Sequence, residues 1–228
     1  MISEIEKRVN DIESFAADVA HELKNPLTSL RSASETFIQS KNKKDQKQMI
    51  EIMFKDIDRI DRLITDISFS SRLDADLVRT KFENIDLFKL LENYISIRAT
   101  KLKYKIIHDQ NETDIQFIGN SNKLVQVFDN LIDNSLSIIG KNCKINIRVF
   151  SKGKKIFILF EDNGPGFPKN AINKIFDRFY TDRINQKEFG KHSGLGLSIS
   201  KQIISAHNGD IFAENIINDY KKIIGARV

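Results

Sequence analysis

The chain has 228 residues, of which 40% are hydrophobic and 29% are charged. This balance is typical of a folded globular protein with one large domain or two ordinary ones, and it excludes disordered and collagen-like classes. The formal net charge is +5 and the pI is near 9.1, but the 36 basic residues are scattered among 31 acidic ones. Scattered charges favour a solvated surface, so we expect no nucleic-acid partner.

The sequence carries a single cysteine, Cys143, so no disulfide can form within the chain. No Cys/His spacing resembles a zinc site. The N-terminus opens on a charged helical pattern rather than a signal peptide, and the apolar stretch at residues 156–160 is far shorter than a membrane span. We therefore expect a cytoplasmic location for the chain as given.

The first predicted element is a long N-terminal helix. Its apolar residues recur at alternating spacings of three and four, which is typical of a coiled coil or helix bundle. They are Ile2, Ile5, Val9, Ile12, Ala16, Val19 and Leu23. Counting around this heptad places His21 at an outward position, whereas a core histidine would lie on the apolar seam. His21 is therefore the first candidate for a reactive side chain.

A second helix follows a polar loop predicted at residues 41–45. It repeats the same apolar spacing at Ile50, Met53, Ile57, Ile60, Ile64 and Ile67. Two antiparallel helices then form a hairpin with one long apolar seam. Because two helices cannot bury this seam alone, we predict a homodimer in which two hairpins form a four-helix bundle. Residues 70–76 are expected to be the linker that follows.

The sequence pattern changes after residue 73, which divides the chain into a helical domain, residues 1–73, and a second domain, residues 74–228. The second domain mixes both periods, and a hairpin turn is predicted at residues 152–154. Helices are predicted at 87–94, 124–139 and 199–206, and strands at 104–108, 145–150 and 156–161. The second domain is therefore predicted to be α+β, with helices on one face of a mixed sheet.

Two glycine-containing loops of the second domain are candidates for a nucleotide site. Asp162 ends a predicted strand and precedes Gly164 and Gly166, which suits a carboxylate that accepts a hydrogen bond from an adenine amino group. The run Ser193-Gly194-Leu195-Gly196-Leu197 leads directly into a helix, whose free backbone donors favour phosphate. Either loop alone also fits an ordinary surface turn. The sequence lacks the patterns of a Rossmann or Walker loop.

Asn130 and Asn134 lie four residues apart, on one face of the helix predicted at 124–139. An amide oxygen is a suitable ligand for Mg²⁺, so one asparagine could bind the metal while the other supports the nucleotide. Two polar residues on the exposed face of an amphipathic helix would show the same spacing.

These segments, in this order, resemble the sequence boxes of bacterial sensor histidine kinases. The run from Phe15 to Leu30, with His21-Glu22-Leu23-Lys24-Asn25-Pro26 inside it, is similar to the H box. The N, G1, F and G2 boxes are matched by residues 130–134, 162–166, 176–180 and 193–197. The resemblance covers nearly the whole chain. It implies a dimeric four-helix bundle followed by an ATP-binding α+β sandwich of the gyrase and Hsp90 type.

The resemblance also implies the activity of a protein-histidine kinase. The γ-phosphoryl group of ATP would pass to His21, with Glu22 as the base, and then to an aspartate in the receiver domain of a response regulator. Asn25 would orient the water that hydrolyses the phosphorylated regulator, and Asn134 would bind Mg²⁺. The run from Phe15 to Phe37 is especially similar to alphaproteobacterial envelope-sensing kinases. This implies an OmpR-like regulator and a parent protein anchored in the inner membrane by upstream segments.

The remaining ATP contacts are implied by the other boxes. They are Asn130, Asp162, Gly164, Gly166, Phe176, Arg178, Phe179, Tyr180, Ser193, Gly194, Leu195, Gly196 and Leu197. Residues 181–192 would form a lid over the nucleotide. The sequence departs from the family pattern at Ser137 and Ile138, where the N box usually carries a basic and an aromatic residue, and at His192, which replaces a glycine. The chain ends at residues 225–228, so we expect an incomplete last strand.

Two other classes of function fit parts of the sequence. An ATP-hydrolysing enzyme of the gyrase, Hsp90 and MutL group would need a glutamate at the position of Asn130 to activate water, so asparagine there favours transfer to a side chain. A non-catalytic dimerisation scaffold fits the altered N box. The presence of His21, Glu22 and Asn134 favours a kinase over such a scaffold.

Overall fold

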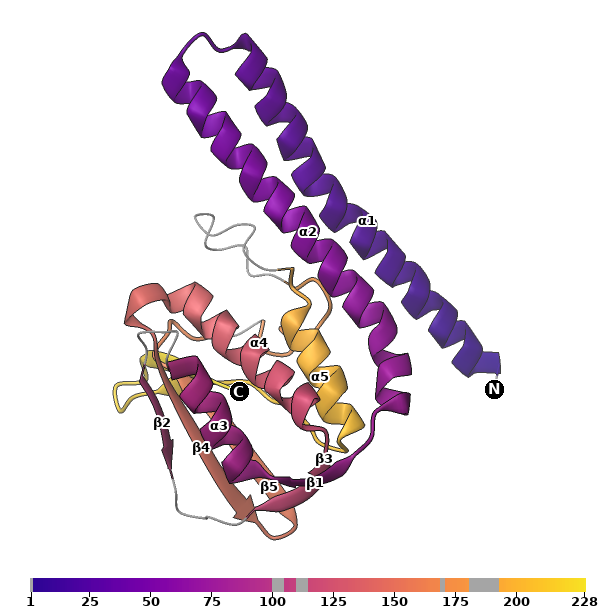
Figure 1. Ribbon diagram of the computed structural model, residues 1–228, viewed down its shortest axis with the longest axis vertical. Helices are drawn as coiled ribbons and strands as arrows, with labels where there is room; N and C mark the ends of the chain where they lie inside the picture. Colours follow the sequence, from indigo (N-terminus) through magenta and orange to yellow (C-terminus); the bar gives the residue numbers. More distant parts are fainter. Residues whose placement is uncertain (1, 100–104, 110–114, 169–170, 181–192) are drawn as a thin grey trace. The chain divides into compact units, whose positions relative to one another are not determined.

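The computed structural model describes residues 2–99, 105–109, 115–168, 171–180 and 193–228. The chain forms two compact units. The hairpin unit comprises residues 1–73 together with 177–195, and the sandwich unit comprises residues 74–176 together with 196–228. The predicted fold class is confirmed, because a helical hairpin is followed by an α+β sandwich (Figure 1).

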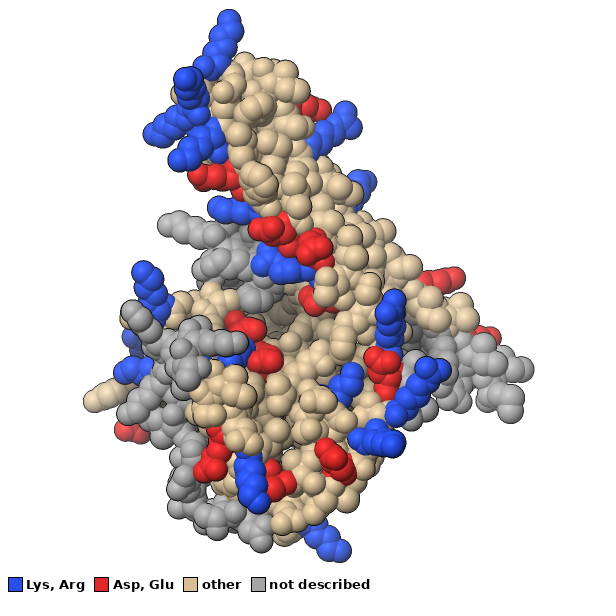
Figure 2. Space-filling model, viewed as in Figure 1, with Lys and Arg blue, Asp and Glu red and all other residues tan. Residues whose placement is uncertain are grey.

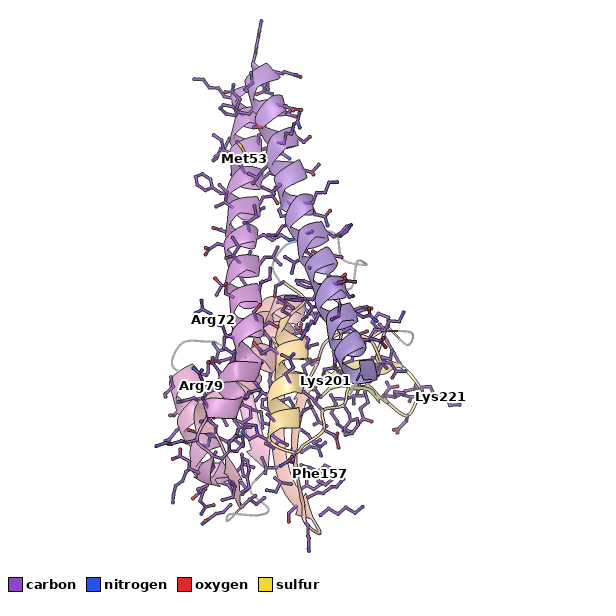
Figure 3. All side chains as sticks on the ribbon, turned by 90° about the vertical axis from the view of Figure 1, so that its right-hand side faces the viewer. Met53, Arg72, Arg79, Phe157, Lys201 and Lys221 are labelled. Carbon is purple, nitrogen blue, oxygen red and sulfur yellow. The ribbon has the colours of Figure 1, made fainter. Side chains whose placement is uncertain are left out.

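The hairpin consists of two long antiparallel helices, α1 (Ile2–Gln39) and α2 (Lys43–Arg79), which lie side by side in Figures 1 and 3. The α1 helix continues through Pro26, whose side chain is fully buried. At the turn, the Asn42 side chain accepts a hydrogen bond from the backbone N–H of Lys44 at 3.0 Å. This bond satisfies a free donor at the start of α2, as expected for a helix cap.

The predicted linker at residues 70–76 is wrong, because α2 continues through this stretch to Arg79. Polar residues suggested a loop, but residues 70–79 contain neither glycine nor proline. Ser70 is buried, and the Leu73 side chain is completely buried, so packing supports the additional helical turns.

The hairpin buries little of its predicted apolar seam. The completely buried Leu63 and Leu73, and Ala33, which is 5% exposed, lie outside the predicted seam. By contrast, large apolar side chains at 12, 54, 57 and 64 are half or more exposed. Two helices have only one interface between them, so an apolar stripe wider than that interface stays in contact with water.

The sandwich unit contains a five-stranded mixed sheet in the order β2-β4-β5-β7-β6. Its strands are β2 (Lys105–Asp109), β4 (Lys144–Lys152), β5 (Lys155–Asp162), β6 (Glu214–Ile217) and β7 (Ile223–Arg227). The β2–β4 pair is parallel and the other pairs are antiparallel. A separate antiparallel pair joins β1 (Glu83–Asp86) and β3 (Gln116–Gly119). The sequence pattern predicted β2, β4 and β5 but missed β1, β3, β6 and β7.

Three helices cover one face of the sheet: α3 (Leu87–Ala99), α4 (Ser121–Ile139) and α5 (Gly196–Ala206) (Figure 1). Phe128 of α4 lies between two rings, with centroid distances of 5.5 Å to Tyr94 of α3 and 5.4 Å to Phe160 of β5. A short 3-10 turn (Gly140–Asn142) connects α4 to β4. The core therefore lies between the helices and the sheet, and Phe128 packs α4 against α3 and β5.

The last strand is short, as expected: β7 pairs with the eight-residue β5 only at Glu161 and Asp162. Residues 223–227 form β7, which lies inside the sheet between β5 and β6. Val228 also pairs with Phe160, through backbone hydrogen bonds of 3.0 and 2.8 Å. The C-terminal residues therefore help to fix the end of β5, where Asp162 lies.

Basic and acidic side chains are interspersed over the face of the sandwich unit that Figure 2 shows. Basic side chains gather at the α1–α2 turn, where Lys41, Lys43, Lys44 and Lys47 are all exposed. Among the described residues, no helix is both long enough and apolar enough to cross a membrane.

Candidate functional site

The α1 helix presents His21 to solvent, with 64% of its side chain exposed. This agrees with the outward heptad position. The neighbouring Glu22 side chain is only 16% exposed, and its Oε1 lies 3.7 Å from Nδ1 of His21. This separation is slightly longer than a hydrogen bond, so a small side-chain rotation would bring the carboxylate onto the ring nitrogen. Nε2 is the ring nitrogen farther from Glu22.

A buried arginine holds the other oxygen of Glu22. Nη2 of Arg59, on α2, donates a hydrogen bond to Oε2 of Glu22 at 3.0 Å, and Arg59 is 7% exposed. A charged group with so little exposure must be paired, because its desolvation is otherwise costly. The pair fixes Glu22 across the two helices of the hairpin. Asn25, one turn after His21 on α1, is exposed.

Arg178 and Phe179 of the F box lie against Phe15 of α1. The Phe15 and Phe179 rings stack with a centroid distance of 5.9 Å, and the Arg178 guanidinium lies 4.9 Å from the centre of the Phe15 ring. Phe179 adopts a φ of 59°, which is unfavourable for a bulky residue. Arg178 and Phe179 thus belong to the hairpin unit, whereas Phe176 is buried in the sandwich unit.

Tyr180 follows with a backbone hydrogen bond to Asp177 at 3.3 Å. The lid predicted at residues 181–192, including His192, lies outside the described residues.

In the sandwich unit, Asp162 ends β5 and is fixed by several hydrogen bonds. Its Oδ1 accepts from the backbone N–H of Gly164 at 2.8 Å and of Ala226 at 3.2 Å. Its Oδ2 accepts from the Ser135 hydroxyl of α4 at 2.7 Å. The carboxylate is therefore held at a defined position before any ligand binds. The buried Cys143 thiol lies nearby, and burial together with the Asp162 charge raises its pKa to about 11.

The glycines after Asp162 allow the loop backbone to lie close to neighbouring atoms. A Cβ on Gly164 would lie 2.9 Å from Oδ1 of Asp162, and Gly166 has a φ of 79°. Asn215 of β6 clamps the loop, because its Oδ1 accepts from the Phe167 N–H at 2.6 Å and its Nδ2 donates to the Phe167 carbonyl at 2.8 Å. The loop is thereby held to the sheet at both ends.

The two asparagines of α4 differ in their surroundings. Nδ2 of Asn130 donates to the Gly196 carbonyl at 2.9 Å and to the Ser200 hydroxyl at 3.2 Å, which ties α4 to the first turn of α5. The Asn134 side chain is half-buried and makes no hydrogen bond to another described residue. Its amide oxygen is thus available to a ligand. The described residues contain no cluster of three or more His, Cys, Asp or Glu side chains that could hold a metal.

The last glycine loop leads into α5. Gly194 has a φ of 72°, and a Cβ there would lie 2.7 Å from the backbone of Phe179. The Leu195 N–H donates to the Ser193 hydroxyl at 3.2 Å, and the Leu195 side chain is completely buried. Gly196 and Leu197 begin α5, whose N-terminal end favours anions.

Sequence reasoning missed three residues that shape these surroundings. Arg59, Ser135 and Asn215 act through hydrogen bonds to Glu22, Asp162 and the glycine loop. Arg59 is a charged residue next to the apolar seam of α2. That position is only a weak indication that its side chain is buried. The partners of Ser135 and Asn215 are distant in sequence, so no local pattern reveals them.

Two family models match the chain. Residues 11–76 match the His Kinase A (phospho-acceptor) domain, and residues 119–224 match the histidine kinase-, DNA gyrase B-, and HSP90-like ATPase family. The chain belongs to the histidine kinases. The phospho-acceptor match includes His21, and the ATPase match includes Asn134 and Asp162. This histidine kinase chain therefore carries both parts of a kinase core.

Curated relatives show the same assignment. The histidine kinase chain is 43% identical, over its whole length, to the sensor protein ChvG of Agrobacterium fabrum, strain C58. Over 94% of its length it is 31% identical to the sensor histidine kinase WalK of Bacillus subtilis, strain 168. The chain spans 40% of the length of that ChvG and 36% of that WalK.

Solved structures share the fold of this histidine kinase. The catalytic domain of histidine kinase ThkA covers 65% of the chain with 26% identity and a TM-score of 0.54, and 94% of that domain is matched. The structure of ThkA in complex with the response regulator protein TrrA covers 97% of the chain, with 22% identity and a TM-score of 0.70. The match spans 61% of that ThkA chain.

Proposed function

We propose that this chain is an autophosphorylating kinase core, which moves the γ-phosphoryl group of ATP to His21 and then to an aspartate of a response-regulator receiver domain. In this proposal residues 1–73 accept the phosphoryl group and dimerise, and residues 74–228 bind the nucleotide. The observation that carries it is the exposed His21 beside a carboxylate held by buried Arg59, on a chain that also has the fixed Asp162 loop.

The geometry around His21 supports in-line phosphoryl transfer. Nε2 faces away from Glu22, so its lone pair can attack the γ-phosphorus while the bond to the β,γ-bridging oxygen breaks and ADP leaves. Glu22 then accepts the proton from Nδ1, which leaves a neutral phosphoimidazole. Arg59 keeps the carboxylate in place for this step and stabilises its charge.

The nucleotide would bind across α4, the loop after β5 and the start of α5. Asp162 accepts a hydrogen bond from the adenine amino group, Gly164 and Gly166 allow close approach, and the N-terminal end of α5 faces phosphate. We further propose that Asn134 holds Mg²⁺, since its amide oxygen has no other described partner. When bound, this ion neutralises phosphate charge. A single protein ligand suits Mg²⁺, which usually keeps phosphate and water oxygens.

The exposed apolar residues of the hairpin support a homodimer. Ile12 is 67% exposed, Phe54 is 63% exposed, and Ile57 and Ile64 are each 51% exposed. Large apolar side chains exposed along a helix hairpin are expected to be covered by an apolar partner. A second hairpin supplies a matching surface by two-fold symmetry.

The partner and the parent protein follow from the resemblance in residues 15–37. We propose an OmpR-like response regulator and a parent protein anchored in the inner membrane. Exposed Asn25, one turn from His21, would position water for dephosphorylation of that regulator.

Hydrolysis of ATP by water is the principal alternative. It needs a carboxylate near the metal asparagine, but Asn130 occupies that position and its amide is bonded to Gly196 and Ser200. The two acidic residues near Asn130 on α4 form ion pairs with Arg98 of α3. Arg98 pairs with Asp129 at 2.9 Å and with Asp133 at 2.6 Å. This arrangement favours transfer to a side chain.

The test is incubation with γ-labelled ATP and Mg²⁺. We expect protein label that is lost in acid, retained in alkali and absent from His21→Gln. Transfer of this label to a purified receiver domain, with loss from the kinase, tests the second step. Rapid ATP turnover that persists in His21→Gln would favour the hydrolase, and absence of nucleotide binding would favour a scaffold.

A further inference from the structure

The Asp162 carboxylate has an unusual balance of hydrogen bonds. Its Oδ1 receives two backbone donors, whereas its Oδ2 receives one side-chain donor, the Ser135 hydroxyl at 2.7 Å. An ionised carboxylate has about four acceptor positions, so these bonds leave about one, on Oδ2. Among the described residues, Ser135 donates the hydrogen bond to Oδ2, and substitution of this one side chain removes it.

The position of Asp162 is otherwise set by the backbone. It pairs with Ile145 of β4 and Ala226 of β7, and a Cβ on Gly225 would lie 2.0 Å from its carbonyl oxygen. The residue therefore cannot move far when Ser135 is replaced. Loss of the hydroxyl would change the hydrogen bonding of Oδ2 while the strand remains in place.

We propose that Ser135 is a positioning residue that makes the nucleotide site select a purine with an amino group at position 6. This inference rests on the proposed function of Asp162. Ser135 has one hydroxyl proton, and Asp162 already accepts it. The hydroxyl oxygen and the free position of Oδ2 are then both acceptors, so the Ser135–Asp162 pair presents no donor to the base.

An acceptor-only pair complements an amino group and opposes a carbonyl. The 6-amino group of adenine donates to it, whereas the 6-carbonyl of guanine would face an oxygen that carries negative charge. A site built for a donor rejects a ligand that lacks it, because its polar groups then remain unpaired. Ser135 contributes to this selection because its hydroxyl occupies one acceptor position of Oδ2, which sets the direction of the position that remains for the base.

The experiment measures, by calorimetry on the full chain, the affinities of two ligands for the wild type and for Ser135→Ala. The ligands are ADP and the diphosphate of purine riboside, which lacks the 6-amino group. We expect the wild type to bind ADP about tenfold more tightly than the analogue, since a hydrogen bond to a charged group is lost. In Ser135→Ala this preference should fall to about threefold or less. GDP should bind more weakly than either ligand to the wild type.

Two further variants separate positioning from structural damage. Ser135→Thr keeps the hydroxyl and should restore the preference for ADP. Ser137→Ala is the matched control, because the Ser137 hydroxyl donates at 2.7 Å to the carbonyl of Asn134 within the same helix. It should leave the preference unchanged.

An unchanged 6-amino preference in Ser135→Ala would overturn the inference, as would an equal loss of affinity for both ligands. If the wild type bound neither ligand, the proposed nucleotide function itself would fall. These two failures are therefore distinguishable.

Discussion

The two units treat the same residue type in opposite ways. Ile57 and Ile64 of the hairpin are each 51% exposed, whereas Ile132 and Ile147 of the sandwich are completely buried. The sandwich closes its core within one chain, because three helices and a sheet enclose it. Two helices cannot enclose a core. The hairpin is thus the part whose structure is expected to depend on a second chain.

The candidate functional groups of the two units also differ in how firmly they are held. His21 is 64% exposed and loosely placed relative to Glu22, but Asp162 is fixed by three hydrogen bonds. If His21 accepts the phosphoryl group as proposed, it must meet both ATP and a regulator, so it has to be accessible. A base-recognition site gains selectivity from rigidity. This difference predicts that substitutions can change phosphoryl transfer and nucleotide binding separately.

The largest expected effect tests that separation directly. His21→Gln should abolish acid-labile labelling and leave ADP binding within about twofold, because His21 makes no nucleotide contact in the proposal. Asn134→Ala should also abolish labelling, but through loss of Mg²⁺-dependent affinity. Labelling and calorimetry on the same preparations check both outcomes. Full activity of Asn134→Ala would remove the metal assignment.

A charge on the exposed face of the hairpin should separate the two chains. Full burial of an isoleucine is worth about 1.5–3 kcal/mol, and each of these is about half exposed in the hairpin. Because the dimer would cover four of them, the double variant Ile57→Asp, Ile64→Asp should weaken dimerisation by at least roughly a hundredfold. Light scattering over a range of concentrations measures this. Ile118→Asp is the control, because Ile118 is 65% exposed on β3 of the sandwich unit. A dimer that survives the double variant would place the interface elsewhere.

Removal of Arg59 should slow the labelling of His21 without changing the affinity for ADP. Arg59→Met retains much of the side-chain volume but leaves Glu22 without its 3.0 Å partner. Misplacement of a catalytic group by about 1 Å can cost about a hundredfold, so the labelling rate should fall roughly ten- to a hundredfold. ADP affinity should not change, and Arg59→Lys should recover part of the rate. Labelling by Arg59→Met at the wild-type rate would show that Glu22 needs no such support.

The smallest effect concerns the buried thiol beside Asp162. Burial and the Asp162 charge raise the pKa of Cys143 from 9.0 to about 11. The unfolded thiol ionises first as the pH rises, so this stabilising contribution is present below pH 9 and is lost between about pH 9 and 11. The loss is roughly 1–3 kcal/mol. Urea unfolding at pH 8 and 10.5 should show a steeper loss of stability for wild type than for Cys143→Ala.

Adjacent acids on β5 show where sequence reasoning succeeds and where it stops. Asp162 was predicted as a site residue because two glycines follow it, and the structure places it at the end of β5 beside α4. Glu161 has no such pattern. Burial would raise its pKa, but hydrogen bonds from Arg148 and Arg227 outweigh this and hold the pKa below its usual value. Its partners lie on β4 and β7, which only the sheet brings together.

The sequence by itself determined the helical hairpin, the longer elements of the sandwich and the outward position of His21. These features depend on local periodicity, glycine placement and residue order, which act over a few neighbouring residues. The tertiary structure decided that α2 continues to Arg79, that residues 223–227 lie between β5 and β6, and that Arg59 and Ser135 hold Glu22 and Asp162. Such contacts join residues tens of positions apart, and their free energy exists only when packing has excluded water.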